Sequence, residues 1–178
     1  MIERRDVEEY LAAFDDNRLL NIVACSRAKI WKGNPGEKET YPARTVYRGG
    51  MFKQAIQCFA EFGKRTGREP FWLILSAKYG LIEPDREISD YNISFSVSSD
   101  AGRTVSGETL RSQWRERRLE RFDTVFAWGG GAYADRIRPL LAGGVRFISP
   151  AAGLPIGRAM GALKEFREEC FRSGTETQ

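Results

Sequence analysis

Four short apolar runs constrain the fold of this chain more than any other feature. The runs over residues 19–25 and 71–76 are continuous rather than alternating, which is typical of strands buried on both faces of a sheet. Helical patterns separate the runs, and strands that alternate with helices favour a parallel sheet between helical layers. The sequence therefore predicts an α/β fold with a mainly parallel sheet. The runs cover residues 19–25, 71–76, 124–128 and 145–149.

Apolar residues recur at the spacing of an amphipathic helix between and around these runs. Two other segments, residues 27–50 and 77–105, show no sustained period and are interrupted by Gly, Pro and Ser. They are expected to be long irregular connections, which in a compact domain usually carry function or move. The predicted helices cover residues 6–15, 51–62, 107–122 and 157–171, with a further helix that ends at residue 141.

The length and composition indicate one domain. The chain has 178 residues, of which 42% are hydrophobic, enough for one buried core and little more. We expect residues 1–173 to form a single three-layer α/β domain and residues 174–178 to form a disordered tail. No signal peptide or long apolar run is found, and the cysteines form no CxxC pair. A cytoplasmic protein without membrane contact is expected.

The absence of histidine limits the possible chemistry. With no His in the sequence, Ser-His-Asp and Cys-His nucleophile systems and His-based zinc sites are excluded. The sequence predicts no metal and no cofactor. Any catalysis must use Lys, Asp, Glu, Tyr, Cys or backbone groups.

Small or polar residues follow three of the four runs, at Cys25–Lys29, Ser76–Gly80 and Gly129–Tyr133. The carboxyl ends of parallel strands lie at one edge of a sheet, so these segments are expected to meet there. Lysines, hydroxyls and glycine backbone N–H groups suit an anionic ligand such as a nucleotide or a DNA strand, although Gly129–Gly131 is also an ordinary tight turn. The predicted ligand-binding residues are Ser26, Lys29, Tyr47, Ser76, Tyr79, Gly80, Tyr91, Gly129, Gly130 and Tyr133.

Three residues are candidates for catalysis. Lys78 directly follows a buried run, and we expect it to pair with Glu83, Asp85, Asp90 or a bound anion, because an unpaired buried charge is costly. Asp85 is a candidate general acid or base, with turn formation as the alternative. Cys25 is a candidate nucleophile, or else a small buried apolar residue.

The predicted helix over residues 107–122 carries much of the excess positive charge of the chain. Between residues 111 and 121 it has five arginines and two glutamates, within a chain of net charge +4. Arg111, Arg115 and Arg118 are predicted to contact a nucleic-acid backbone. A solvated face with pairs of opposite charge is the alternative.

Two motifs resemble a known family. Cys25-Ser26 with Lys29, and the segment Leu75–Asp85 with Tyr91, resemble the short bacterial and phage relatives of the YaaA peroxide-stress family. The resemblance covers about residues 20–165, and it implies a compact α/β DNA-binding domain linked to protection against peroxide. A more distant similarity connects the pattern to a domain of archaeosine synthase, which acts on a modified nucleobase in tRNA. The chain is shorter than YaaA, and Asp90 stands where that family has Pro before Tyr.

Two functions follow from these observations. In the first, the chain binds DNA, a nucleotide or a nucleobase in a crevice at the strand ends, in a stress response or in DNA protection. In the second, it is an enzyme that processes a nucleobase or nucleotide, by glycosidic-bond or base-modification chemistry, with Lys78 and a nearby carboxylate. A purely structural partner protein is a third possibility. The sequence assigns no oligomeric state.

Overall fold

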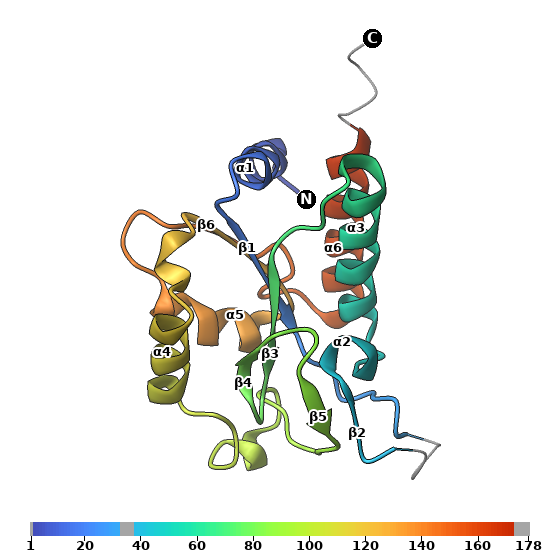
Figure 1. Ribbon diagram of the computed structural model, residues 1–178, viewed down its shortest axis with the longest axis vertical. Coiled ribbons are helices and arrows are strands. Elements are labelled where there is room, and N and C mark those ends of the chain that lie inside the picture. The colour runs from blue at the N-terminus through green and yellow to red at the C-terminus, as the bar shows by residue number, and fades with distance from the viewer. Residues whose placement is uncertain (1, 33–37, 173–178) are drawn as a thin grey trace.

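A five-stranded sheet forms the centre of the computed structural model, which describes residues 2–32 and 38–172 (Figure 1). Four of the strands run parallel, and only β4 pairs antiparallel, with β3. The predicted α/β class and mainly parallel sheet are confirmed. In spatial order the strands are β4 (Gly80–Ile82), β3 (Trp72–Ser76), β1 (Leu19–Ala24), β6 (Thr124–Trp128) and β7 (Arg146–Ile148).

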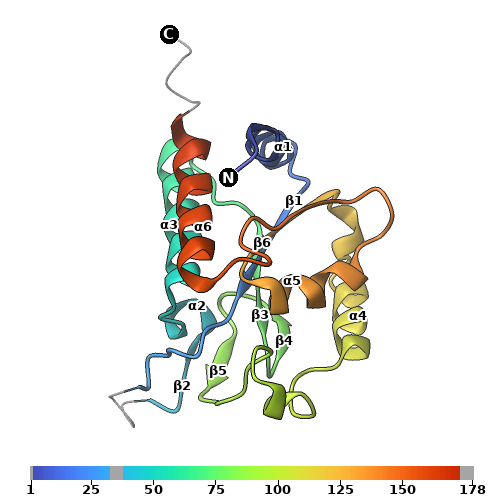
Figure 2. The ribbon, with the colours of Figure 1, turned by 180° about the vertical axis from the view of Figure 1, so that it is seen from behind.

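Helices cover both faces of this sheet (Figures 1 and 2). One layer consists of α1 (Arg4–Asp15), α3 (Gly50–Thr66) and α6 (Ile156–Arg172). The other consists of α4 (Gly107–Glu116) and α5 (Gly131–Ile137). All residues of β1, β3 and β6 are buried, which explains why these strands are apolar without alternation.

One buried polar residue inside the sheet forms three side-chain hydrogen bonds. Asn21 of β1 is completely buried, and its Oδ1 accepts hydrogen bonds from the Tyr10 hydroxyl at 2.8 Å and the Trp128 indole at 2.9 Å. Its side-chain amide donates to the carbonyl of Phe71 at 3.3 Å. A buried amide without these partners would cost about 1–3 kcal/mol. Asn21 therefore joins α1, β1 and β6 in one core.

The two segments expected to be irregular contain short elements. In the first segment β2 (Thr40–Pro42) leads into a helical turn, α2 (Ala43–Val46). In the second, β4 returns along β3, and β5 (Glu87–Ser89) pairs antiparallel with β2. Strands of three residues are too short to show a period, and the partner of β2 lies far away in the sequence. The predicted tail, residues 174–178, lies outside the described residues.

Two predicted helices end earlier than expected. The helix predicted over residues 107–122 stops at Glu116, because Arg118 adopts a left-handed backbone with φ of 52° before a short 3₁₀ turn. The helix predicted to reach residue 141 stops at Ile137, and a 3₁₀ turn containing Pro139 follows it. Local backbone geometry, which side-chain spacing does not report, decides both ends.

The connections define a switch point in the sheet. From β1 the chain crosses through α3 to β3, and from β6 it crosses through α5 on the opposite face to β7. The direction of winding therefore reverses between β1 and β6, which lie side by side. Ligands of open α/β sheets bind outside the carboxyl ends of the strands at such a point.

Candidate functional site

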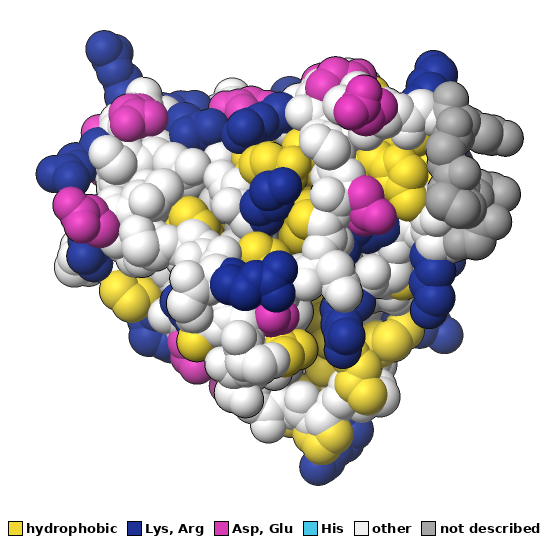
Figure 3. All heavy atoms as spheres, turned by 90° about the horizontal axis from the view of Figure 1, so that it is seen from below, with side chains coloured by type: hydrophobic (Ala, Val, Ile, Leu, Met, Phe, Trp, Pro, Cys, Tyr) yellow, Lys and Arg dark blue, Asp and Glu magenta, His cyan; other side chains and the backbone are white. Residues whose placement is uncertain are grey.

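A cavity of about 450 Å³ opens at this switch point. Cys25 and Ser26, directly after β1, form part of its wall, and Gly130 and Tyr133 come from the segment after β6. The start of α3, the start of α6 and the segment around Ser94 complete the wall. Figure 3 shows the side of the molecule on which the parallel strands end, where basic side chains lie beside hydrophobic ones. We call this space the switch-point cavity.

Glycines allow the elements around the cavity to approach closely. A Cβ atom on Gly49, just before α3, would lie 2.5 Å from Cβ of Ser26. A Cβ atom on Gly129 would lie 2.6 Å from Cβ of Ala24. The Ser26 hydroxyl accepts a hydrogen bond from the backbone N–H of Gly49 at 3.0 Å. Gly129 therefore packs the turn after β6 against β1, whereas Gly130 lines the cavity.

A buried hydroxyl network joins the end of β3 to the loops that fold over it. The Ser76 hydroxyl donates to the Tyr91 hydroxyl at 2.9 Å, and the hydroxyls of Tyr91 and Tyr47 are 2.8 Å apart. Burial raises the pKa of Tyr47 and that of Tyr91 above their ordinary values, so both phenols stay protonated. The three residues lie together but outside the set of described residues that line the cavity, and their predicted contact with a ligand stays a prediction.

Cys25 and Tyr133 connect two strand ends directly. The Cys25 sulfur lies 3.2 Å from the Tyr133 hydroxyl, and both residues line the cavity. Burial raises the pKa of Tyr133 above its ordinary value, so its phenol is protonated and can donate this hydrogen bond. The ring of Tyr133 packs edge-to-face on Phe95, which holds it in place.

Lys29 is buried against Tyr91 and lies outside the set of described residues that line the cavity. Its side chain is 6% exposed, and its ammonium group lies 4.3 Å from the centre of the Tyr91 ring. No carboxylate among the described residues forms an ion pair with it. Burial lowers the pKa of Lys29, and ionised Cys25 or Asp90 would oppose that shift. A backbone bridge between Lys29 and Tyr47 fixes this loop over the sheet edge.

Lys78 does not reach the cavity. It is exposed, its ammonium group lies 5.0 Å from the Tyr79 ring centre, and within the described residues it forms no ion pair. Asp85 pairs instead with Arg44 at 2.7 Å, and Glu83 pairs with Arg117 at 2.8 Å. The expected pairing of Lys78 with Glu83, Asp85 or Asp90 is therefore wrong within the described residues, and its pairing with a bound anion stays a prediction. Its side chain turns outward because β4 folds straight back along β3.

Tyr79 and Gly80 belong to this reversal of the chain. Gly80 has a φ of 75°, and a Cβ atom there would lie 2.2 Å from the Gln113 side-chain oxygen. That oxygen accepts a hydrogen bond from the backbone N–H of Leu81 at 2.8 Å. Tyr79 is half-buried and packs edge-on against Tyr91 at 5.6 Å. Both residues form the hairpin, and their predicted contact with a ligand stays a prediction.

The arginines of α4 and the turn after it divide into two groups. Arg117 pairs with Glu83, and Arg121 donates to backbone carbonyls at 2.8 and 2.9 Å. Arg111, Arg115 and Arg118 are exposed and form no ion pair within the described residues. The three arginines predicted to contact nucleic acid are therefore free to bind an external anion.

The sequence did not indicate several residues of the cavity wall. Arg27 is the only charged side chain among the described lining residues. Leu154 and Ile156 are 37% and 69% exposed at the rim, and Met160 follows them in α6. In the sequence, only the pair Gly49-Gly50 indicated that the start of a helix packs closely against another segment. Gly49 directly precedes α3, and Gly50 is its first residue.

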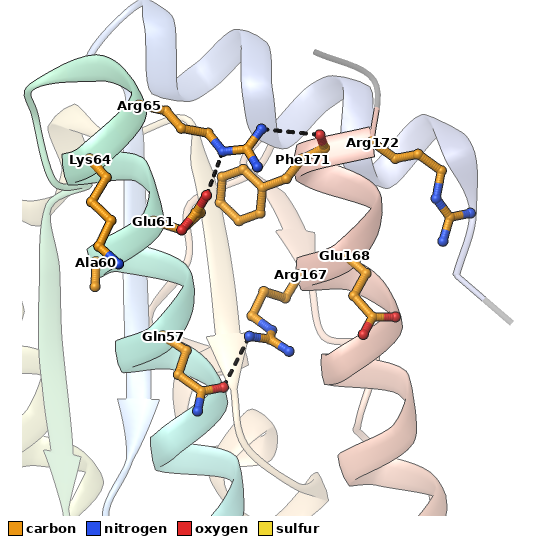
Figure 4. A pocket seen from close by; sticks show the side chains of 9 residues that line it. All are labelled: Gln57, Ala60, Glu61, Lys64, Arg65, Arg167, Glu168, Phe171 and Arg172. Carbon is orange, nitrogen blue, oxygen red and sulfur yellow. Dashed lines mark hydrogen bonds and ion pairs between the residues drawn. The ribbon is translucent and has the colours of Figure 1, made fainter. Parts of the chain in front are cut away.

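A second, larger cavity offers fewer side chains for binding a ligand. A groove of about 500 Å³ runs between α3 and α6, away from their first turns (Figure 4). In this groove Arg65 pairs with Glu61, and Arg167 donates a hydrogen bond to the uncharged Gln57 side chain at 3.0 Å. Among the described residues, no three His, Cys, Asp or Glu side chains gather as a metal site requires. No helix of the described part is long and apolar enough to cross a membrane.

The fold and the site define a doubly wound α/β protein with a ligand-sized cavity at its switch point. The chain belongs to the family described as "Family of unknown function (DUF6884)", whose model matches residues 20–165. It is similar to "Uncharacterized protein YfjM" of Bacillus subtilis (strain 168), with 29% identity over 115 residues, 64% of this chain and 71% of that protein. No solved structure matches the chain significantly. The resemblance to YaaA and to archaeosine synthase stays a prediction.

Proposed function

We propose that this protein binds a nucleotide or another nucleobase-bearing ligand in the switch-point cavity. The observation that carries the proposal is the composition of the wall, in which Arg27 is the only charged side chain among the described residues. The remainder is backbone, hydroxyl and apolar surface. Such a wall favours a ligand with an anionic group and an apolar ring.

The anionic group has two sources of attraction besides Arg27. Helices α3 and α6 both begin at the cavity, with Gly50 and Met51 of one and Ile156 of the other in its wall. The first N–H groups of a helix have no partner within the helix, and its dipole places partial positive charge there. A phosphate near these helix starts would meet N–H donors and no lining carboxylate.

The apolar group fits the rest of the wall. Phe52, Met160 and the ring of Tyr133 present apolar surface, with Leu154 and Ile156 at the rim. A volume of about 450 Å³ lies within the range of small-molecule sites, which are largely apolar with a few placed polar groups. A planar base is of the size and polarity that this surface accommodates.

Titration calorimetry with nucleoside monophosphates, the matching nucleosides and orthophosphate tests the proposal. We expect a monophosphate to bind more tightly than its nucleoside, and Arg27→Gln to weaken the monophosphate about tenfold, because one charge-assisted bond is lost. Arg4→Gln, a control at an exposed residue of α1, should bind as the parent does. Absence of binding by every nucleoside and nucleotide would refute the proposal.

A second candidate function is association with a nucleic-acid strand along α4. The observation that favours it is that Arg111, Arg115 and Arg118 have no ion pair within the described residues. Each phosphate contact makes affinity depend on salt. A mobility shift with duplex DNA should weaken steeply as salt rises, and should be lost in the triple glutamine variant. No shift at low salt removes this function.

A further inference from the structure

We infer that this protein binds single-stranded nucleic acid at the amino ends of its central strands, where a base stacks on Phe71 and neighbouring phosphates meet Arg68 and Arg121. This inference deepens the second candidate function, on which it rests for the class of partner, by naming the form of the nucleic acid and a further contact site. It does not depend on the switch-point cavity, which lies at the carboxyl ends of the strands.

A groove of about 200 Å³ opens at this end of the sheet, on the side of α1 (Figure 1). Leu19 is the first residue of β1, Phe71 directly precedes β3, and Phe122 comes shortly before β6. Arg68 and Arg121 are the only charged side chains in the described wall, which therefore has no carboxylate. We call this space the Phe71 groove.

Neutral groups hold both arginines of the Phe71 groove. Arg121 donates to two backbone carbonyls at 2.8 and 2.9 Å, and Arg68 donates to the Asn17 side chain and to the carbonyl of Phe14, the latter at 3.0 Å. A guanidinium has more N–H donors than these bonds use. Neither arginine forms an ion pair within the described residues. Two positioned cations therefore keep charge and donors for an external anion.

Phe71 presents an exposed aromatic surface beside these charges. It is 44% exposed, and its ring stacks on that of Phe122 with the centroids 5.1 Å apart and the planes inclined by 24°. The Arg121 guanidinium lies 5.4 Å from the centre of the Phe71 ring and 4.4 Å from that of Phe122. These contacts fix the ring and leave its exposed part to a planar ligand. Unpaired bases stack on such rings and on guanidinium planes.

The size of the groove and the charges beside it favour a strand over a free nucleotide. A volume of about 200 Å³ is below the usual range for sites that enclose a small molecule, so the groove receives one planar group while the rest of the ligand lies on the surface. The backbone of Arg118 bonds to Arg121, and Arg118 with Arg115 and Arg111 extends the positive charge along α4 without ion pairs among the described residues. Successive phosphates complement such a row. A duplex stacks its bases inside, so the exposed ring favours an unpaired strand.

Fluorescence anisotropy with labelled oligothymidylate and oligouridylate tests the inference. We expect both strands to bind more tightly than a DNA duplex of the same length, and a preference between them to identify the sugar. Phe71→Leu keeps the apolar bulk but loses the aromatic face, and should weaken both strands about tenfold, the effect of one lost base–aromatic stack. An abasic strand of the same charge should bind the parent and Phe71→Leu equally, because it has no base to stack.

A second pair of arginine and phenylalanine supplies the matched control. The Arg65 guanidinium lies 4.9 Å from the centre of the Phe171 ring, but Arg65 pairs with Glu61. Phe171→Leu should therefore leave the binding of every strand unchanged. Arg121→Gln should weaken oligothymidylate and the abasic strand alike and lower the salt dependence by about one phosphate contact. Circular dichroism checks that each variant is folded.

The outcomes separate this inference from the second candidate function. A duplex that binds as tightly as the single strands, or single-strand binding that Phe71→Leu leaves unchanged in folded protein, would overturn the inference. A duplex shift that only the triple glutamine variant loses would then leave the second candidate function standing alone. Single-strand binding through Phe71 without a duplex shift would remove duplex association and support the inference. Competition by polyglutamate as strong as by an unlabelled strand would indicate an acidic peptide and overturn it.

Discussion

Lys29 and Lys78 stand in nearly the same sequence context and reach opposite environments. Each follows a buried parallel strand and a serine, yet Lys29 is buried against Tyr91 and Lys78 is exposed beside Tyr79. After β1 the chain runs on over the sheet edge and is tied to Tyr47 by a backbone bridge. After β3 it reverses into β4 within a few residues. The path that follows a strand therefore decides whether a lysine at its end is buried or exposed.

The largest expected effect comes from removing the ring on which Lys29 rests. Tyr91→Ala deletes a ring that is 9% exposed and breaks the hydroxyl bonds to Tyr47 and Ser76. We expect the free energy of unfolding, measured by urea titration, to fall by about 3–4 kcal/mol, as for other buried aromatic residues truncated to Ala. Tyr91→Phe keeps the ring and should cost about 1–2 kcal/mol. Equal losses in the two variants would show that the ring does not support the lysine.

The hairpin that turns Lys78 outward gives the next largest effect. Gly80→Ala places a side chain at φ of 75° and against the Gln113 side chain. We expect a loss of about 2 kcal/mol in the free energy of unfolding, from backbone strain together with the displaced glutamine. Gly67→Ala is the matched control, because its φ is also 75° but a Cβ atom would meet nothing within 4 Å. Its loss should be about 1 kcal/mol.

The two lysines themselves should respond differently to loss of charge. Lys29→Met removes a buried ammonium that has no ion pair within the described residues, so the free energy of unfolding at pH 7 should rise by about 1 kcal/mol. Lys78→Met changes an exposed side chain and should stay within about 0.5 kcal/mol of the parent. Destabilisation by Lys29→Met would reveal an anionic partner within the folded chain and would contradict the description of this lysine as unpaired.

The smallest effect is a difference in pH dependence. The pKa of Lys29 is lowered in the folded chain, so the unfolded chain binds more protons between that pKa and the ordinary value of 10.5. The free energy of unfolding of the parent should therefore rise with pH across this window, relative to Lys29→Met. Buried tyrosines and cysteines act in the opposite direction, but they are the same in both proteins and cancel in the difference. The Lys78→Met protein should parallel its parent.

The apolar pattern of the sequence determined the α/β class, the strands β1, β3, β6 and β7 and the edge at which a site would lie. For β1, β3 and β6 the strand assignment follows from local composition, because a strand covered on both faces must be apolar throughout. β7 is only partly buried and contains Arg146. The same reasoning predicted that the segments containing Cys25, Ser26, Gly130 and Tyr133 meet at one edge of the sheet. All four residues line the cavity.

Only the tertiary structure decided which charged residues share that cavity. Arg27 lines the cavity and Lys78 does not, although the local sequence pattern does not distinguish either residue from its neighbours. The antiparallel return of β4 and the pairing of β2 with β5 depend on contacts between segments remote in sequence. Those contacts, rather than residue type, determine where a flexible side chain points. Periodicity and composition therefore could not predict which charged side chains line the cavity.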